Sequence, residues 1–251
     1  MSLICLSPSA PAAFCLLDSS ESFFSRLWER IYTNLVYNDR WVSILKGMGV
    51  TVEVIVIAIT LGTVLGLILA LCKLSKGGLM AVPRGIAKAY ITAIRGTPMM
   101  LQLLIIYFGV FANVSGNKVL IAGIAFGLNS AAYVAEIIRG GILSVDGGQT
   151  EAGRSLGMNS TQTFLRIVLP QALKNALPTY CSEFIVLIKE TAICGYIALT
   201  DLTRAVDIIR SRTFDPWIPL LAAALLYLLM TGILSKLFGL LERRMRQSDQ
   251  R

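Results

Sequence analysis

The amino-acid sequence contains no histidine, and only 15% of its 251 residues are charged. Histidine is the commonest general base in enzymes, so its absence removes the usual partner of a nucleophilic serine or cysteine. A soluble domain carries about 25% charged residues. The composition therefore disfavours both a soluble fold and the common hydrolytic enzymes, and we predict no catalytic residue.

The sequence also lacks the clustered cysteines that metal or disulfide chemistry would need. Its five cysteines lie at positions 5, 15, 72, 181 and 194, without a C-x-x-C pair. Zinc sites and disulfide frameworks both require closer and more regular spacing. We therefore expect no metal site and no disulfide framework.

A third absence concerns nucleotides. No glycine is followed directly by lysine, so the phosphate-binding pattern G-x4-G-K-[ST] does not occur. The chain is not expected to bind ATP or another cofactor by itself. Any ATP-dependent step would have to be carried out by a different polypeptide.

Apolar side chains, by contrast, are in excess: they make up 55% of the residues and give a mean hydropathy of +0.68. They come in long runs, as expected of a chain whose solvent is a lipid bilayer. The net charge of +8 is compatible with nucleic-acid binding, but the basic cytoplasmic loops of a membrane protein give the same balance. We assign the charge to membrane topology and expect no nucleic-acid partner.

The apolar runs predict an all-α integral membrane protein with five transmembrane helices. The first span is about 34 Å long at ~1.5 Å per residue, against a hydrocarbon core of about 30 Å. In the second region two short runs are expected to form one helix, kinked at Arg95–Pro98 because proline removes a backbone donor. The predicted spans are residues 50–72, 86–112, 119–138, 176–199 and 217–241.

The region before the first span divides into two parts. Residues 1–21 contain no Lys or Arg, unlike the start of a signal peptide, and their Ser, Pro and Ala content predicts a loose extension. Residues 22–45 carry one apolar helical stripe and are expected to lie on the membrane surface. We see no internal repeat, so residues 22–251 are expected to form a single transmembrane domain.

Basic residues indicate which side of the membrane each loop faces. Segment 73–88 holds four basic residues and no acidic one, and the tail after Leu241 holds four arginines. In a five-span chain both lie on the same side, together with residues 150–171. The positive-inside rule makes that side cytoplasmic, so the C-terminus is expected inside and the N-terminus outside.

The stretch TEAGRSLGMNSTQTFLRIVLPQ, residues 150–171, reads as a folded polar module between two spans. Ala152 and Leu156 share one helical face, and Gly157 supplies the positive φ that ends a short helix. The first half of the stretch therefore predicts a short helix that exposes a small apolar face.

The second half of the stretch predicts another short helix. Asn159 and Gln162 have the spacing of a capping box, which would begin that helix. Pro170 is expected to mark a break before the next span. From periodicity alone, the two helices are either an ordinary surface hairpin packed on the bundle or a module for contact with a partner.

Glu151-Ala152-Gly153, then Gly157, then Ile167-x-Leu169-Pro170 match the pattern E-A-A-x3-G-x9-I-x-L-P in every spacing, with Gly153 replacing the second Ala. That pattern resembles the cytoplasmic loop of ABC-importer permeases, where it forms coupling helices that dock on the ATPase subunit. The resemblance implies a two-helix coupling loop at about residues 148–170. Its implied ATPase-coupling residues are Glu151, Ala152, Gly153, Leu156, Gly157, Phe164, Ile167, Leu169 and Pro170.

The resemblance extends from about Trp41 to Arg246. The segments KGMGVTVEV, RGTPMMLQ, FIVLIKETAI and LTDLTRAVDIIRSRTFDPW are similar to the polar-amino-acid (histidine/glutamine) branch of these permeases. The implied protein is a permease subunit of a bacterial inner-membrane importer of polar amino acids, and not an enzyme. Its implied partners are a dimer of ABC ATPase subunits that bind ATP, a second permease subunit, identical or homologous, and an extracytoplasmic substrate-binding protein.

The resemblance also implies a mechanism of alternating access, in which residues 150–171 pass the motion of the ATPase to the spans. The alternative from another class is a secondary transporter driven by an ion gradient. Such a protein needs an intramembrane ion site, and it usually has a longer chain with inverted repeats. We find no such repeat in the sequence.

Several charged residues fall deep in the predicted spans, where each costs about 2.5–3.5 kcal/mol to insert. Glu183 and Glu190 are seven residues apart, so they share a helical face that suits contact with a substrate's ammonium group. Pairing between Lys and Glu of different helices is an equal alternative, and Thr97 and Gln102 are available for polar contact at the kink. The substrate-path candidates are Arg95, Thr97, Gln102, Glu183, Lys189 and Glu190.

The loop between the fourth and fifth predicted spans is expected to form a short helix after Thr200. One of its faces is apolar and the other carries acidic and basic residues in pairs three apart. This helix is either a lip packed on the bundle or part of an external gate where a binding protein lands. Its apolar face consists of Leu202, Ala205, Val206 and Ile209.

Overall fold

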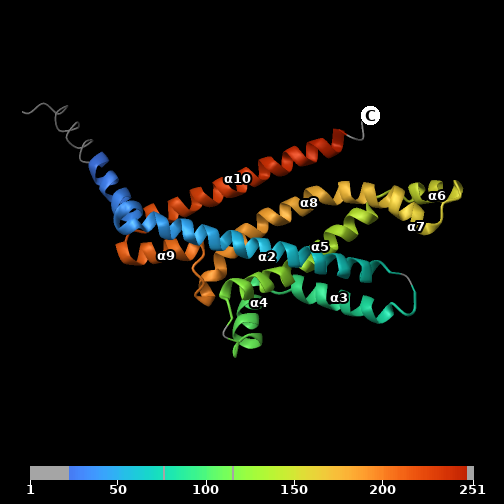
Figure 1. Ribbon diagram of the computed structural model, residues 1–251, viewed down its shortest axis with the longest axis horizontal. Coiled ribbons are helices and arrows are strands. Elements are labelled where there is room, and N and C mark those ends of the chain that lie inside the picture. Colours follow the sequence, from blue (N-terminus) through green and yellow to red (C-terminus); the bar gives the residue numbers. More distant parts are fainter. Residues whose placement is uncertain (1–22, 76, 115, 248–251) are drawn as a thin grey trace, which may run out of the picture.

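The computed structural model describes residues 23–75, 77–114 and 116–247, and every regular element in these ranges is a helix (Figure 1). The predicted all-α class is therefore confirmed for the described part of the chain. The loose extension expected at residues 1–21 lies outside it.

Three helices in the described ranges are long and apolar enough to cross a membrane, at Phe23–Leu74, Lys118–Leu143 and Trp217–Met245. The bent pair Ala81–Arg95 and Met99–Val110 makes a fourth if its two parts are one span. The fold is thus that of a multi-pass membrane protein with three to four candidate spans, and the first, third and fifth predicted spans fall within the three long helices.

The N-terminal part of the chain is less regular than predicted. A helical segment at 23–31 is followed by a π turn at Tyr32–Val36 and a 3-10 turn at Tyr37–Asp39. Asn38 and Asp39 then take positive φ values of 55° and 52°, which Asn and Asp tolerate better than most residues. The surface helix expected over residues 22–45 is therefore interrupted, and its final part belongs to the next helix.

That next helix, α2 (Arg40–Leu74), contains the first predicted span. Its 35 residues reach about 52 Å at ~1.5 Å per residue, so it is longer than the hydrocarbon core is thick. The sequence prediction followed only the apolar part of this helix, because its first turns carry polar residues.

A sharp bend separates α3 (Ala81–Arg95) from α4 (Met99–Ile105), which continues into a π turn at Ile106–Val110. The two parts meet at 109°, so the pair is a broken span or a re-entrant loop. The sequence placed the break correctly, but the single kinked helix expected over 86–112 is not what forms. Gly96 and Thr97 lie outside the helix before Pro98, which allows the chain to change direction by 109°.

Helix α5 (Lys118–Leu143) lies at the centre of the bundle and packs on α2, α3 and α8. In the most apolar stretch of α5, 67% of the residues are buried, whereas in that of the last candidate span, Trp217–Met245, only 11% are. Small residues allow this close packing. A Cβ added at Gly66 of α2 would lie 2.7 Å from Cβ of Val134, and one added at Gly123 of α5 would lie 2.5 Å from Cγ2 of Ile57.

The chain then forms α6 (Gly147–Ser155) and α7 (Ser160–Thr163), which project at one end of the molecule in Figure 1. A π turn at Phe164–Val168 joins α7 to α8 (Leu169–Glu190), and a 3-10 helix at Thr191–Ile197 follows. The fourth predicted span, 176–199, therefore has different bounds. Four charged residues within α8 lower its hydropathy, and it is not among the candidate spans.

Helices α9 (Leu202–Thr213) and α10 (Trp217–Gln247) complete the described chain. The apolar face predicted for α9 is confirmed, because Leu202, Ala205, Val206 and Ile209 are all buried. The last predicted span lies within α10, which exposes most of its large apolar side chains. A lipid bilayer would cover such a surface.

The loop between α9 and α10 forms hydrogen bonds with the N-terminal segment, residues 23–39. Arg30 donates two hydrogen bonds to the Asp215 carboxylate, from Nε at 2.9 Å and from Nη2 at 2.7 Å. The buried Asn34 donates to the same carboxylate from Nδ2 at 3.0 Å. The hydrogen bonds and charge of Arg30 lower the pKa of Asp215.

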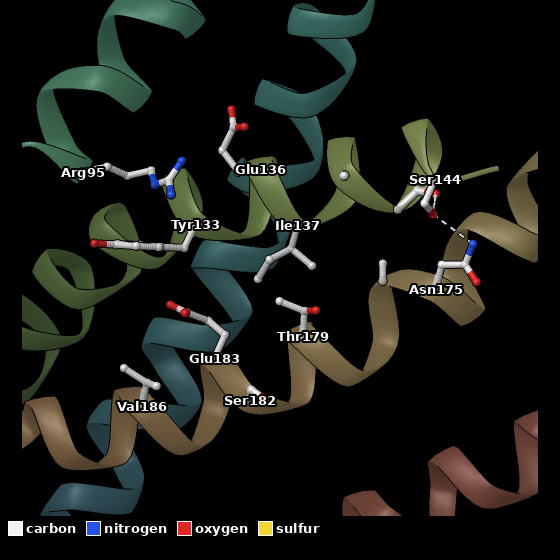
Figure 2. Close-up of a pocket in the computed structure, with 13 residues that line it drawn as sticks. Arg95, Tyr133, Glu136, Ile137, Ser144, Asn175, Thr179, Ser182, Glu183 and Val186 are labelled. Carbon is white, nitrogen blue, oxygen red and sulfur yellow. Dashed lines mark hydrogen bonds between the residues drawn. The ribbon is translucent and has the colours of Figure 1, made fainter. Parts of the chain in front are cut away.

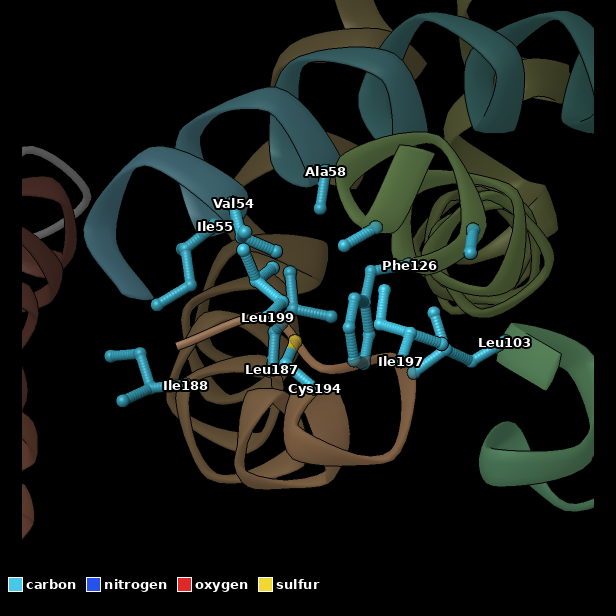
Figure 3. Close-up of a cluster of buried hydrophobic side chains, with 12 residues drawn as sticks. Val54, Ile55, Ala58, Leu103, Phe126, Leu187, Ile188, Cys194, Ile197 and Leu199 are labelled. Atoms are coloured by element: carbon cyan, nitrogen blue, oxygen red, sulfur yellow. The ribbon is translucent and has the colours of Figure 1, made fainter. Parts of the chain in front are cut away.

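The largest buried apolar cluster joins α2, α4, α5, α8 and the 3-10 helix after it (Figure 3). Phe126 of α5 is fully buried at its centre, with Leu103 of α4 and Leu187 of α8 against it. This cluster packs α4 and α8 against α5. It thereby determines which side chains of α3, α5 and α8 face one another further along the bundle.

Candidate functional site

A cavity of about 530 Å³ lies between α5, α8 and the last residue of α3 (Figure 2). In Figure 2, Arg95, Tyr133 and Glu183 gather at one end, and Ser144 and Asn175 lie at the other. It is lined by Arg95, Tyr133, Glu136, Ile137, Gly140, Gly141, Ser144, Asn175, Ala176, Thr179, Ser182, Glu183 and Val186.

Arg95 brings a positive charge to the cavity from the C-terminal end of α3. Its guanidinium lies 5.4 Å from the centroid of the Tyr133 ring, within the range of a cation–π contact. A cation at a helix C-terminus is also favoured by the helix dipole. The ring contact therefore holds the guanidinium at the wall of the cavity.

Glu183 brings a carboxylate to the same end of the cavity from α8. No salt bridge joins it to Arg95 among those formed by the described residues. One acidic and one basic group thus line a single space without neutralising each other by direct contact. This arrangement suits a ligand that carries both charges.

Glu136, also in the lining, is already bound by two cations. Its carboxylate forms ion pairs with Lys73 of α2 and with Arg139 of α5, the latter at 2.9 Å. The charged group ties the ends of α2 and α5 together. This agrees with the anchoring role that the position of Glu136 near a span end suggests.

The other substrate-path candidates lie elsewhere. Gln102 and Thr97 hydrogen-bond to each other, between Gln102 Nε2 and Thr97 Oγ1 at 2.8 Å, in the bend between α3 and α4. Lys189 is exposed and Glu190 is half-buried at the end of α8. None of these four side chains belongs to the lining of the cavity. The structure therefore brings Arg95 and Glu183 together and leaves the remaining candidates apart from them.

Sequence reasoning missed the polar lining of the cavity. The sequence candidates do not include four polar lining residues: Tyr133, Asn175, Thr179 and Ser182. The last three of these lie at helical spacing on α8. On α8, lining residues recur at 175, 179, 182, 183 and 186, the spacing of one helical face. A search for polar residues at that spacing around Glu183 would have found them.

The stretch 150–171 forms the short helix and turn expected of its first half and the capping box expected of its second half. Asp146 caps α6 by accepting from the Gly148 N–H at 2.8 Å, and Gly157 ends the helical turn with a φ of 81°. The predicted capping box is confirmed, because the Gln162 N–H donates to Asn159 Oδ1 at 2.8 Å and the Asn159 N–H to Gln162 Oε1 at 3.0 Å.

The predicted break at Pro170 is wrong. The chain is helical without interruption from 160 to 190, so the second short helix of the stretch runs directly into α8. A π turn precedes the proline, and within it the Leu169 N–H bonds to Phe164 O, five residues back. This wider turn changes the hydrogen-bond register just before the residue that has no N–H to donate.

Gly153, which replaces the second Ala of the pattern E-A-A-x3-G-x9-I-x-L-P, is buried where α6 meets the segment 160–168. A Cβ there would lie 2.8 Å from Ile167 Cδ1 and 2.8 Å from Thr163 Cγ2. Glycine therefore lets the two halves of the loop pack closely. Of the residues implied to contact the ATPase, Leu156 is the most prominent, with 81% of its surface exposed. Glu151 and Ala152 are also exposed, and Phe164, Ile167 and Leu169 are partly buried.

One protein family and several known proteins are similar in sequence to this chain. The family described as "Binding-protein-dependent transport system inner membrane component" matches residues 62–247. The arginine transport system permease protein ArtQ of Bacillus subtilis is 38% identical over 208 residues, which cover 82% of this chain and 94% of ArtQ. The octopine transport system permease protein OccM of Rhizobium radiobacter is 36% identical over 212 residues, covering 80% and 85% of the two chains.

A solved structure is also similar. A chain in the crystal structure of an amino acid ABC transporter with histidines is 42% identical and superposes with a TM-score of 0.75. The match covers 80% of this chain and 94% of that chain. The similarity thus extends over nearly the whole transmembrane part.

Proposed function

Because the chain belongs to the binding-protein-dependent transport system inner membrane component family, we propose that it is the permease subunit of an ATP-driven importer of polar amino acids. One observation carries the proposal: a single helix, α8, begins in the coupling loop and lines the cavity. Leu169 and Glu183 are about 21 Å apart along that helix at ~1.5 Å per residue. A push on the loop would therefore move the cavity wall.

The charges in the cavity lining complement those of a free amino acid, which carries a carboxylate and an ammonium group. A guanidinium is a strong partner for a carboxylate, and a carboxylate is a strong partner for an ammonium group. Arg95 would receive the substrate's carboxylate and Glu183 its ammonium group, with hydroxyl and amide groups from Tyr133, Ser182 and Asn175 available for the rest of the molecule. Relatives named for arginine and octopine transport support an amino acid or an amino-acid derivative as the substrate class.

The coupling loop supplies a surface for a partner ATPase. Leu156 and Leu165 are large apolar side chains exposed on this loop, which no lipid would cover if the loop lies in the cytoplasm. Two ATPase subunits, which alone bind ATP, would approach each other on binding it and carry two permease subunits with them. The resulting rigid-body motion opens the cavity alternately to an outer binding protein and to the cytoplasm.

We further propose five spans, with α8 counted as the fourth. Four charged residues lower its hydropathy, and one of them, Glu183, faces the polar cavity rather than lipid. An odd number of spans places the N-terminus outside a bacterial cell membrane and the C-terminus, with its arginines, inside. Residues 22–251 then form one permease domain.

The experiment that tests the function is reconstitution of the chain in liposomes with its ATPase and binding protein, followed by uptake of a panel of labelled amino acids. ATP-dependent uptake of one or a few of them is expected. Uptake that follows an imposed ion gradient and ignores ATP would instead support a secondary transporter.

A further inference from the structure

The last turn of α3 lacks a backbone hydrogen-bond donor. In an α-helix the carbonyl of Ile94 would accept from the N–H of residue 98, but that residue is proline. The Thr97 N–H lies 3.4 Å from the same oxygen, which makes only a long hydrogen bond. Within a membrane no bulk water replaces the lost donor, so a side chain has to do so.

Gln102 of α4 provides that side chain. Its Nε2 lies 2.8 Å from the Ile94 carbonyl and 3.0 Å from the Thr97 carbonyl. The two N–H groups of the amide are shared among these two carbonyls and Thr97 Oγ1, which lies 2.8 Å from the same nitrogen. Gln102 is only 7% exposed, and its amide bridges the two arms of the 109° bend.

Asn129 of α5 determines which way the Gln102 amide points. Its Nδ2 donates to Gln102 Oε1 at 2.9 Å, and Asn129 is only 3% exposed. A glutamine amide turned by a half rotation would present its oxygen to the two carbonyls, which repel it. The hydrogen bond from Asn129 stabilises the orientation in which Gln102 donates to them.

Helix α5, which carries Asn129, also contacts Arg95 of α3. Tyr133 lies one turn beyond Asn129 on α5, and its ring lies beneath the Arg95 guanidinium. Arg95 stands between Ile94 and Thr97, whose carbonyls Gln102 binds. Helix α5 thus contacts the bend at two points, through Asn129 and Gln102 at one and through Tyr133 at the other.

We propose that Asn129 and Gln102 are positioning residues for the substrate path: they hold the bend between α3 and α4 in the geometry that directs Arg95 into the cavity. The proposal rests on the proposed function, in which Arg95 receives the substrate's carboxylate. Neither amide lines the cavity, so their effect on transport passes through Arg95.

A double-mutant cycle on the KM for uptake by the reconstituted importer tests this route. Asn129→Ala and Gln102→Met, each made alone, are expected to raise KM about tenfold with little change in maximal rate. In an Arg95→Gln background, the same substitutions are expected to change KM by less than about twofold. The control is Asn113→Ala, since Asn113 is exposed in a loop and its loss should leave KM unchanged.

An equal fall of the maximal rate in both backgrounds, with KM unchanged, would overturn the proposal in favour of a purely structural role. If Asn129→Ala does not reach the membrane, Asn129→Leu replaces it, because leucine keeps the side-chain volume and removes the donor. Additive increases of KM in the two backgrounds would also contradict a route through Arg95.

A second measurement does not depend on transport. In a chain whose five cysteines are replaced by alanine, the rate at which Arg95→Cys reacts with a charged thiol reagent reports where residue 95 lies. Adding Asn129→Ala is expected to change that rate at least about threefold, and an unchanged rate would contradict the proposal. Absence of ATP-dependent uptake by the complete wild-type complex would instead contradict the proposed function.

Discussion

At the scale of single residues, the polar side chains inside the bundle fall into two groups. Gln102 and Glu136 are saturated by partners in the protein, the first by backbone carbonyls and Asn129, the second by Lys73 and Arg139. Arg95 and Glu183 face the cavity and form no salt bridge among those of the described residues. Residue type and depth in a span did not distinguish these groups, because both consist of polar groups that are costly in lipid.

Glu183→Gln is the sharpest single-residue prediction. Because the amide cannot form a charge-assisted bond to an ammonium group, KM for the transported amino acid should rise about tenfold or more, with the protein still inserted. Lys189→Gln serves as the control, since Lys189 is exposed on the same helix outside the lining. Unchanged KM in Glu183→Gln would leave that carboxylate with a structural role only.

Gly153→Val tests the close contact inside the coupling loop. Extra methyl groups against Ile167 and Thr163 should destabilise the local packing by about 1–3 kcal/mol, and tryptic cleavage at the exposed Arg154 should become about tenfold faster. Gly147→Val is the matched control, because a Cβ at Gly147 meets open space. Equal cleavage rates for the two variants would show that the contact does not stabilise the loop.

At the scale of helices, sequence signals succeeded where a local rule decides the outcome. Gly157 ends a helix with positive φ and Asn159 opens one with a capping box, since both features depend only on neighbouring residues. The proline rule failed at Pro170, where a π turn accommodates the ring, and understated the bend at Pro98. The bend at Pro98 is held by the Asn129–Gln102 hydrogen bond from the next helix, α5, which no rule about neighbouring residues predicts.

Gly157 allows a prediction about the bend of the coupling loop. A β-branched side chain is strained at a φ of 81°, so Gly157→Val should abolish most ATP-dependent uptake while the protein still reaches the membrane. Gly157→Asn should keep most of the uptake, because asparagine tolerates positive φ and a Cβ there meets open space. Similar uptake by both variants would mean that the backbone turn is not what matters.

The contact between the N-terminal segment and the α9–α10 loop should depend on pH. Arg30 lowers the pKa of Asp215 in the folded protein below its ordinary value of 3.8. The ion pair therefore stabilises the fold fully at pH values above 3.8, and this stabilisation is lost as the pH falls through the lowered pKa of the folded state. The Tm of the wild type should exceed that of Asp215→Asn at neutral pH, and the difference should shrink below about pH 4.

Asp39→Asn is the control for this pH dependence, since Asp39 is exposed and outside the contact with Arg30. Its Tm should differ little from that of the wild type. A Tm difference between the wild type and Asp215→Asn that stays constant down to pH 3 would show that the ion pair does not stabilise the fold.

At the scale of the whole molecule, the fold connects the proposed partner surface to the cavity through α8. Apolar runs in the sequence predicted the long helices well, because burial in lipid needs length and hydrophobicity alone. They could not define α8, because four of its polar residues, Asn175, Thr179, Ser182 and Glu183, face a cavity rather than lipid. The position of that cavity depends on how α3, α5 and α8 pack, which no local pattern in the sequence specifies.

The central claim is that the coupling loop moves the cavity wall through α8, and the access of one cavity residue tests it most directly. A single cysteine at Thr179, in an otherwise cysteine-free chain within the reconstituted importer, is labelled from outside by a membrane-impermeant thiol reagent. We predict labelling that is several-fold faster with ATP and binding protein than without ATP, and no ATP effect when Gly157→Val is added. Labelling that ignores ATP, or that responds to it equally in the Gly157→Val chain, would contradict the account.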